Sequence, residues 1–187
     1  MAQEWKYSSD KTGSDERAKG SDNRGNVSSR SDSRSYYNSR DQGLTFSVVF
    51  DFQSAAAGEY GAYWKNDSTS KELVIDSIGV NSVEATRIKL WRVTGTAAGG
   101  TTVTPTNLNF TKSHLAEATA MEGASAATGI TGLTTVSLID FVYVAATGHE
   151  EFRLDDRLRL GQGDAIALEY DEGTGGDMSG VIFGFYE

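Results

Sequence analysis

Apolar side chains fall on every second residue from Leu44 to Phe52, which is the period of a β-strand with one buried face. Further segments rich in β-branched and aromatic residues follow, separated by turn-forming small residues, at 58–66, 71–80, 85–93, 134–146, 151–170 and 181–187. About eight strands of this kind predict an all-β fold. We expect an antiparallel β-sandwich of jelly-roll type, with an immunoglobulin-like sandwich as the alternative.

Three of these segments carry more specific expectations. The apolar phase shifts between Ile75 and Ile78, which predicts a β-bulge near Asp76–Ser77. The nearly continuous apolar run at 134–146 predicts a central strand covered on both faces. The segment 151–170 keeps one phase on either side of Gly161–Asp164, which predicts a β-hairpin.

In the segments that separate the predicted strands, the types of residue predict turns or helices. The small residues of 94–100 predict a turn. Pro105 cannot donate to a ladder, so it predicts an edge or a turn between sheets. Residues 111–121 contain good helix formers and predict a short helix, but the glycines at 123–132 favour an extended path instead.

The first 43 residues differ in composition from the rest of the chain. Ser, Asp, Arg, Asn and Gly dominate, and no apolar period is present. Such a segment buries too little surface to offset its conformational entropy. We therefore divide the chain into an extended polar N-terminal arm at 1–43 and a β-sandwich body at 44–187. The arm alone is expected to stay unfolded and to become ordered against neighbouring chains.

The arm also holds the predicted partner-binding residues. Trp, Tyr and Arg are the residue types enriched at interface hot spots, and the arm's aromatic side chains have no local core to enter. The residues that we predict to contact a partner are Trp5, Tyr7, Arg24, Arg30, Arg34, Tyr36, Tyr37 and Arg40. A solvated mixed-charge tail is the alternative reading of this composition.

Net charge separates the two parts as well. The arm carries +1 and the body −10, which together give the net charge of −9. An acidic body argues against nucleic acid as a partner, because phosphate binding needs a basic surface. No apolar run approaches the length of a membrane span or of a signal-peptide core, so we expect no membrane partner and synthesis in a cytoplasm without that export route.

No catalytic, metal or cofactor site is predicted. The chain has no cysteine, and its histidines, His114 and His149, lie in segments with no reason to meet. Adjacent carboxylates such as Glu150–Glu151 point to opposite faces of a strand. Residues 171–177 lack the ligand spacing of an EF-hand loop. No Gly-x-Ser-x-Gly nominates a nucleophile, although a Ser-His-Asp triad is recognised by geometry and stays open. We therefore predict a protein that is not an enzyme.

Four aromatic residues of the body allow two interpretations. They are Tyr60, Tyr63, Trp64 and Trp91. Packing in a core or an interface is the favoured interpretation. A platform on which sugar rings stack is the alternative.

From Lys71 to Glu187 the chain resembles β-sandwich modules of tailed-bacteriophage virion proteins, namely capsid decoration or cement proteins and heads of short fibres. The residues that carry the likeness are KELVIDSI at 71–78, TPTNLN at 104–109, LRLGQGDAIAL at 158–168 and GFYE at 184–187. The resemblance implies a structural virion protein, assembled in the host cytoplasm, whose arm fastens neighbouring capsid subunits and whose body self-associates, with a trimer favoured. The major capsid protein or another virion protein would be its partner. A receptor- or carbohydrate-binding module of a tail fibre is the alternative that it implies.

Overall fold

The structure is a computed structural model, and it describes residues 6–8, 15–17, 39, 42–54, 56–124, 129–172 and 176–187. Near the N-terminus, β1 (Lys6–Ser8) and β2 (Asp15–Arg17) form a short antiparallel ladder of their own. All other strands belong to a separate body, which is described by itself below.

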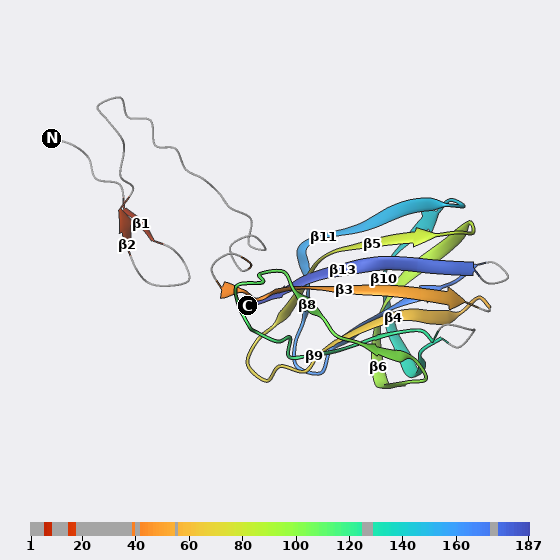
Figure 1. Cartoon of the computed structure of the whole chain (residues 1–187), viewed down its shortest axis with the longest axis horizontal. Helices are drawn as coiled ribbons and strands as arrows, with labels where there is room; N and C mark the ends of the chain where they lie inside the picture. The colour runs from red at the N-terminus through yellow and green to blue at the C-terminus, as the bar shows by residue number, and fades with distance from the viewer. Residues whose placement is uncertain are drawn as a thin grey trace, which may run out of the picture. The chain divides into compact units, whose positions relative to one another are not determined.

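The body consists of two antiparallel sheets that pack face to face (Figure 1). The first sheet has the order β10-β6-β12-β4-β9-β7, formed by β4 (Glu59–Asn66), β6 (Thr86–Ala98), β7 (Thr101–Val103), β9 (Ala118–Glu122), β10 (Thr131–Val144) and β12 (Ala165–Tyr170). The second has the order β11-β5-β13-β3-β8, formed by β3 (Thr45–Ser54), β5 (Leu73–Ser82), β8 (Thr106–Asn107), β11 (Gly148–Leu160) and β13 (Gly176–Tyr186). The predicted β-sandwich is therefore confirmed.

The order in which the strands pair is that of a jelly roll. Counting inward from the two ends of the body, β3 pairs with β13, β4 with β12, β5 with β11 and β6 with β10. Successive pairs alternate between the two sheets, as they do when one long antiparallel ribbon is rolled up. The small strands β7, β8 and β9 are inserted between β6 and β10. This pairing confirms the jelly-roll prediction.

The core lies between the sheets and is built from alternate residues of each strand. In β3, Phe46, Val48, Phe50 and Phe52 are at most 1% exposed, whereas Val49 on the outer face is 63% exposed. Trp64 of β4 is fully buried against this layer. The alternation that predicted the strand from sequence is thus the alternation that fills the core.

Two local expectations are confirmed by the strand register. Ser77 pairs with Phe183 of β13 and Ile75 with the next residue, Gly184, so Asp76 is skipped in this ladder as a bulge. Pro105 lies between β7 of the first sheet and β8 of the second, at a turn between sheets.

Three local expectations are wrong, and a fourth is decided between its two alternatives. The apolar run at 134–146 forms most of β10, which is an edge strand and largely exposed rather than central. The turn Gly161–Asp164 joins β11 and β12, which lie in different sheets, so 151–170 is not a hairpin. Most of 94–100 continues β6 as far as Ala98. Residues 111–121 contain no helix and lead into β9, so the extended alternative was correct.

Candidate interaction surface

The four edges of the two body sheets are protected very differently. An exposed strand edge can pair with another chain unless it is short, charged or covered. The edge strands β7 and β8 have only 3 and 2 residues. The edge strand β11 is long, but its sequence GHEEFRLDDRLRL is rich in charged residues. Only β10 combines 14 residues with a single charged side chain, Asp140.

The side chains of β10 are apolar and exposed. Val136 is 51% exposed, Leu138 44%, Phe141 46% and Tyr143 59%. Scattered exposed apolar residues are ordinary, but a contiguous group of this kind on one strand marks an interaction surface. Because this strand is also an unprotected edge, β10 is the main candidate for contact with another molecule.

Irregularities in β10 bring three of these side chains to one face. The register against β6 shifts between Leu138 and Asp140, so that Ile139 is skipped. As a result Leu138 stands opposite Trp91, Phe141 opposite Lys89 and Tyr143 opposite Arg87. These β6 residues alternate with the buried Ile88 and Leu90 and therefore face outward. We call Leu138, Phe141 and Tyr143 the β10 strip.

The cations beside the β10 strip are fixed by one carboxylate. Asp171 accepts hydrogen bonds from Lys89 and from Arg87, whose Nε lies 2.6 Å from Oδ2. Burial by itself would raise the pKa of Asp171, but the hydrogen bonds from Lys89 and Arg87 outweigh it and hold the pKa below its usual value. Asp171 is therefore an anion that keeps both cations in place.

The aromatic rings of this face are also fixed by contacts with neighbouring side chains. Phe141 and Tyr143 meet edge to face, and the Arg87 guanidinium lies 5.8 Å from the centre of the Tyr143 ring. Trp91 donates from Nε1 to Glu169, and Lys89 lies 5.8 Å from the centre of its ring. Rings fixed before contact lose little side-chain entropy on binding. The face beside β10 is thus a preorganised aromatic surface.

A second exposed apolar group lies in the loop between β8 and β9. Phe110 is 86% exposed and Leu115 83%. This region also binds the end of the predicted arm: Asn107, the last residue of β8, donates from Nδ2 to the Gly43 carbonyl at 2.8 Å, and Asn109 of the loop donates to the Ser39 carbonyl at 2.6 Å. The end of the predicted arm is therefore hydrogen-bonded to the body.

The structure does not test the predicted partner-binding residues of the arm. Trp5, Arg24, Arg30, Arg34, Tyr36, Tyr37 and Arg40 lie outside the described residues. Tyr7 belongs to β1, of which the backbone is described. Their contact with a partner stays a prediction.

The four aromatic residues of the body do not form one platform. Trp64 is in the core and Tyr63 is 2% exposed, which confirms core packing for these two. Tyr60 and Trp91 pack against the cluster around Tyr63 on the outer face of the first sheet. The β10 strip, by contrast, was missed by sequence reasoning. The signal that would have found it is the contrast between the nearly uncharged β10 and the highly charged β11.

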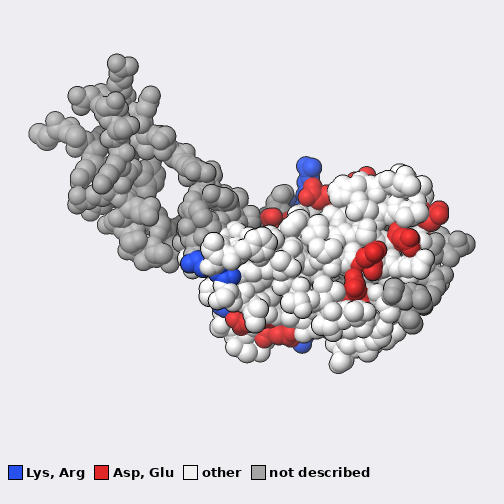
Figure 2. All heavy atoms as spheres, in the orientation of Figure 1, with Lys and Arg blue, Asp and Glu red and all other residues white. Residues whose placement is uncertain are grey.

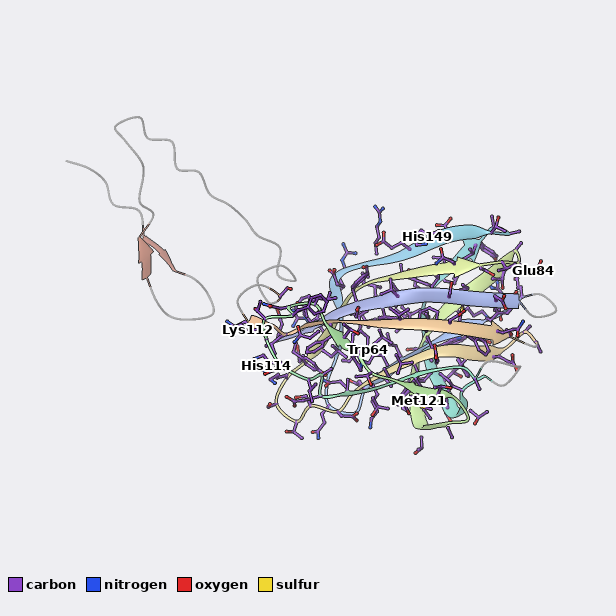
Figure 3. All side chains as sticks on the ribbon, in the orientation of Figure 1. Trp64, Glu84, Lys112, His114, Met121 and His149 are labelled. Carbon is purple, nitrogen blue, oxygen red and sulfur yellow. The ribbon has the colours of Figure 1, made fainter. Side chains whose placement is uncertain are left out.

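The two histidines lie far from one another. Figure 3 shows His149 on β11 and His114 next to Lys112 at the opposite end of the body. No group of three or more His, Asp or Glu side chains that could hold a metal ion occurs among the described residues. Nor does the described part of the chain contain a helix long and apolar enough to cross a membrane.

Comparison with known proteins identifies no relative: no family model, no curated protein and no solved structure matches this chain.

Proposed function

We propose that this chain is a structural virion protein, a capsid decoration protein that acts by adhesion and not by catalysis. The observation that carries this proposal is the β10 edge, which is long, apolar and nearly uncharged where the other sheet edges are short or charged. A jelly roll is a fold of capsid proteins, and the likeness of residues 71–187 to phage virion modules supports the same assignment.

The body self-associates through the β10 strip in this proposal. A strand of 14 residues spans roughly 46 Å at about 3.3 Å per residue. An edge of this length offers unpaired backbone groups together with Leu138, Phe141 and Tyr143, which a neighbouring copy can cover with another part of its surface. A single edge is small beside a stable interface of about 800 Å² per partner. Attachment therefore depends on several contacts at once.

The arm supplies the second set of contacts. The end of the arm is attached to the body by the hydrogen bonds that Asn107 and Asn109 donate to the carbonyls of residues 43 and 39. In this proposal residues 1–38, which precede this point in the sequence, contact the major capsid protein or another virion protein. Ordering such a segment weakens each contact, but many copies on one particle bind with high avidity.

Self-association is tested by light scattering of the purified full chain. We expect an oligomer, with three copies favoured by the resemblance, that dissociates when Leu138→Lys places a charge in the β10 strip. Val49→Lys is the matched control, because Val49 is 63% exposed on the other sheet. A wild-type monomer at high concentration, or an oligomer that survives Leu138→Lys, would count against the proposal.

Attachment is tested on assembled particles. A photo-cross-linking amino acid at position 5 or 36 should capture a capsid polypeptide. Deleting residues 1–43 should leave a folded body that is no longer incorporated. Full incorporation of the truncated chain would refute the fastening role of the arm.

A further inference from the structure

The outer face of the second sheet carries a groove that is independent of β10. It has a volume of about 390 Å³ and runs over β3, β13, β5 and β11. A smaller hollow of about 200 Å³ adjoins it and shares Asn81 and Ser179 with it. Sites for small molecules have volumes of about 300–1,000 Å³, so the groove has room for a small ligand.

A straight row of polar side chains crosses the floor of this groove. In the strand register His149 stands opposite Asn81, Asn81 opposite Ser179, and Ser179 opposite Asp51. Residues directly opposite one another in a sheet point to the same face. The row therefore presents an imidazole, an amide, a hydroxyl and a carboxylate side by side on four adjacent strands.

The first two members of the row are already oriented by each other. His149 Nδ1 lies 3.0 Å from Asn81 Oδ1. An amide oxygen only accepts hydrogen bonds, so Nδ1 is the donor in this pair, and in its neutral form the ring then offers Nε2 as an acceptor. The amide nitrogen of Asn81 keeps its donors. This pair can thus accept from one hydroxyl group and donate to another.

The groove is open beside the row because residue 79 is glycine. Gly79 is the next outward-facing position on β5 after Asn81, between Glu151 of β11 and Val181 of β13. A Cβ at this position would lie 3.2 Å from His149 Cε1 and 3.7 Å from Val181 Cγ1. Any larger side chain here would fill the space next to the imidazole.

The chemistry of the lining limits the class of ligand. No Lys or Arg is among the described residues that line the groove, and Asp51 and Asp177 give these hollows an acidic character, which disfavours phosphates and sulfates. Figure 2 views the body from this side and shows acidic side chains on it, with basic ones toward its margins. The exposed Val49 and the partly exposed Val181 add apolar surface beside the polar row.

A neutral ligand with many hydroxyl groups and apolar C–H faces matches this combination. We propose that the groove over Gly79, Asn81, Ser179 and His149 binds a saccharide. Alternating polar and apolar groups on the floor bind the hydroxyls and the C–H faces of a sugar ring. This inference goes beyond the decoration role, because it gives the body a ligand of its own on a surface that self-association through β10 leaves open.

Binding is tested with the fluorescently labelled full chain on a printed array of bacterial and mammalian glycans. Titration with free glucose, galactose and N-acetylglucosamine follows, with amide chemical shifts as the readout. We expect the chain to retain at least one glycan, and the shifts to cluster on residues 79–81, 149 and 179–181. Asn81→Ala is expected to weaken retention by roughly tenfold, since it removes the amide donor and the partner that orients His149.

Two further variants show whether a loss of binding comes from a filled groove or from an unfolded chain. Gly79→Val fills the groove beside His149 and should abolish retention. Ser77→Val is the matched control, because Ser77 lies on the same face of β5 outside the groove lining. Asn81 is exposed, so Asn81→Ala keeps the test valid if Gly79→Val unfolds the chain. Retention of no glycan and no sugar by the wild type, or retention unchanged by both Gly79→Val and Asn81→Ala, would overturn the inference without affecting the β10 proposal.

Discussion

The rings of Phe141 and Tyr143 meet edge to face on β10, with their centres 5.6 Å apart and their planes at 87°. Both side chains are about half exposed, so this pair stands on the surface of the sheet and not in its core. Edge-to-face pairs are favourable beyond the area that they bury. The arrangement fixes two large rings on the surface, where a partner can contact them, without removing apolar side chains from the core.

The Phe141 ring should therefore matter more for association than for stability. We expect Phe141→Ala to lower the free energy of unfolding by less than about 1 kcal/mol, whereas Phe152→Ala, at a position 1% exposed, should lower it by about 3–5 kcal/mol. Urea unfolding at a protein concentration low enough to give monomers measures both. Equal losses for the two variants would show that Phe141 is a core residue.

Asp171 should make stability depend on pH in the acid range. Its folded pKa is lowered, so its contribution is fully present above its unfolded pKa of about 3.9 and is lost as pH falls through the lower folded pKa. We expect Asp171→Asn to cost about 1–3 kcal/mol at pH 7, and the difference from wild type to shrink below about pH 4. Unfolding followed by circular dichroism across this range measures it.

Glu172→Gln is the control for this titration. Glu172 lies 3.3 Å from Arg87, but its side chain is 48% exposed, so we expect a change below about 0.5 kcal/mol at any pH. If Asp171→Asn gives a pH-independent loss, the carboxylate charge is not what holds Arg87 and Lys89.

Asn66 is a buried amide that ties three segments together. Its Nδ2 donates to the carbonyls of Lys71 at 2.9 Å and Leu160 at 2.8 Å, and its Oδ1 accepts from the Ser68 amide at 2.9 Å. Asn66→Asp would turn the nitrogen that faces two carbonyls into an oxygen, which should destabilise the fold by about 3–5 kcal/mol at pH 7.

Protonation should partly rescue Asn66→Asp. The new carboxyl is buried without a cation, so we expect its folded pKa to lie above its unfolded value, and stability relative to wild type to rise as pH falls. Parallel chemical denaturation of both proteins from pH 4 to pH 8 checks the direction. A stability difference that stays constant with pH would mean that the substituted side chain has left the interior.

Gly180 has no room for a side chain. A Cβ there would lie 2.2 Å from the Gly79 carbonyl oxygen and 2.7 Å from Phe50 Cζ, so one strand would have to move away from the next. We expect Gly180→Ala to cost about 3 kcal/mol or more. Gly163→Ala is the comparison, because nothing lies within 4 Å of that position and only its φ of +80° opposes a side chain, at a cost of about 1 kcal/mol. Thermal unfolding ranks the two, and a larger loss for Gly163→Ala would contradict the expected order.

Sequence patterns predicted where the strands lie in the chain better than which strands pair with one another. The alternation from Leu44 to Phe52 sets one face of β3 against the core, and the phase shift after Ile75 marks a real bulge. These features are local, because the period of side chains along a strand follows from backbone geometry. The turn Gly161–Asp164 shows the limit: the same residue types serve a hairpin and a crossing between sheets, and only tertiary pairing decides which forms.

The candidate surface escaped prediction for a related reason. An apolar run such as 134–146 is expected to be buried, and nothing within the run shows that it stands at an edge. The groove over Gly79 could not be predicted from the sequence either. Its lining residues come from β3, β5, β11 and β13, and only the pairing of these strands brings them together. Polar residues spread over four strands carry no common motif.

The position of β13 bears on how the molecule is made. This strand lies between β5 and β3, and it is the one that follows all the others in sequence. While a ribosome is still translating the residues that precede β13, the strand that pairs with both β3 and β5 is missing. The sheet closes only when residues 176–186 have emerged, so a nascent chain stalled before that point should be a substrate for chaperones.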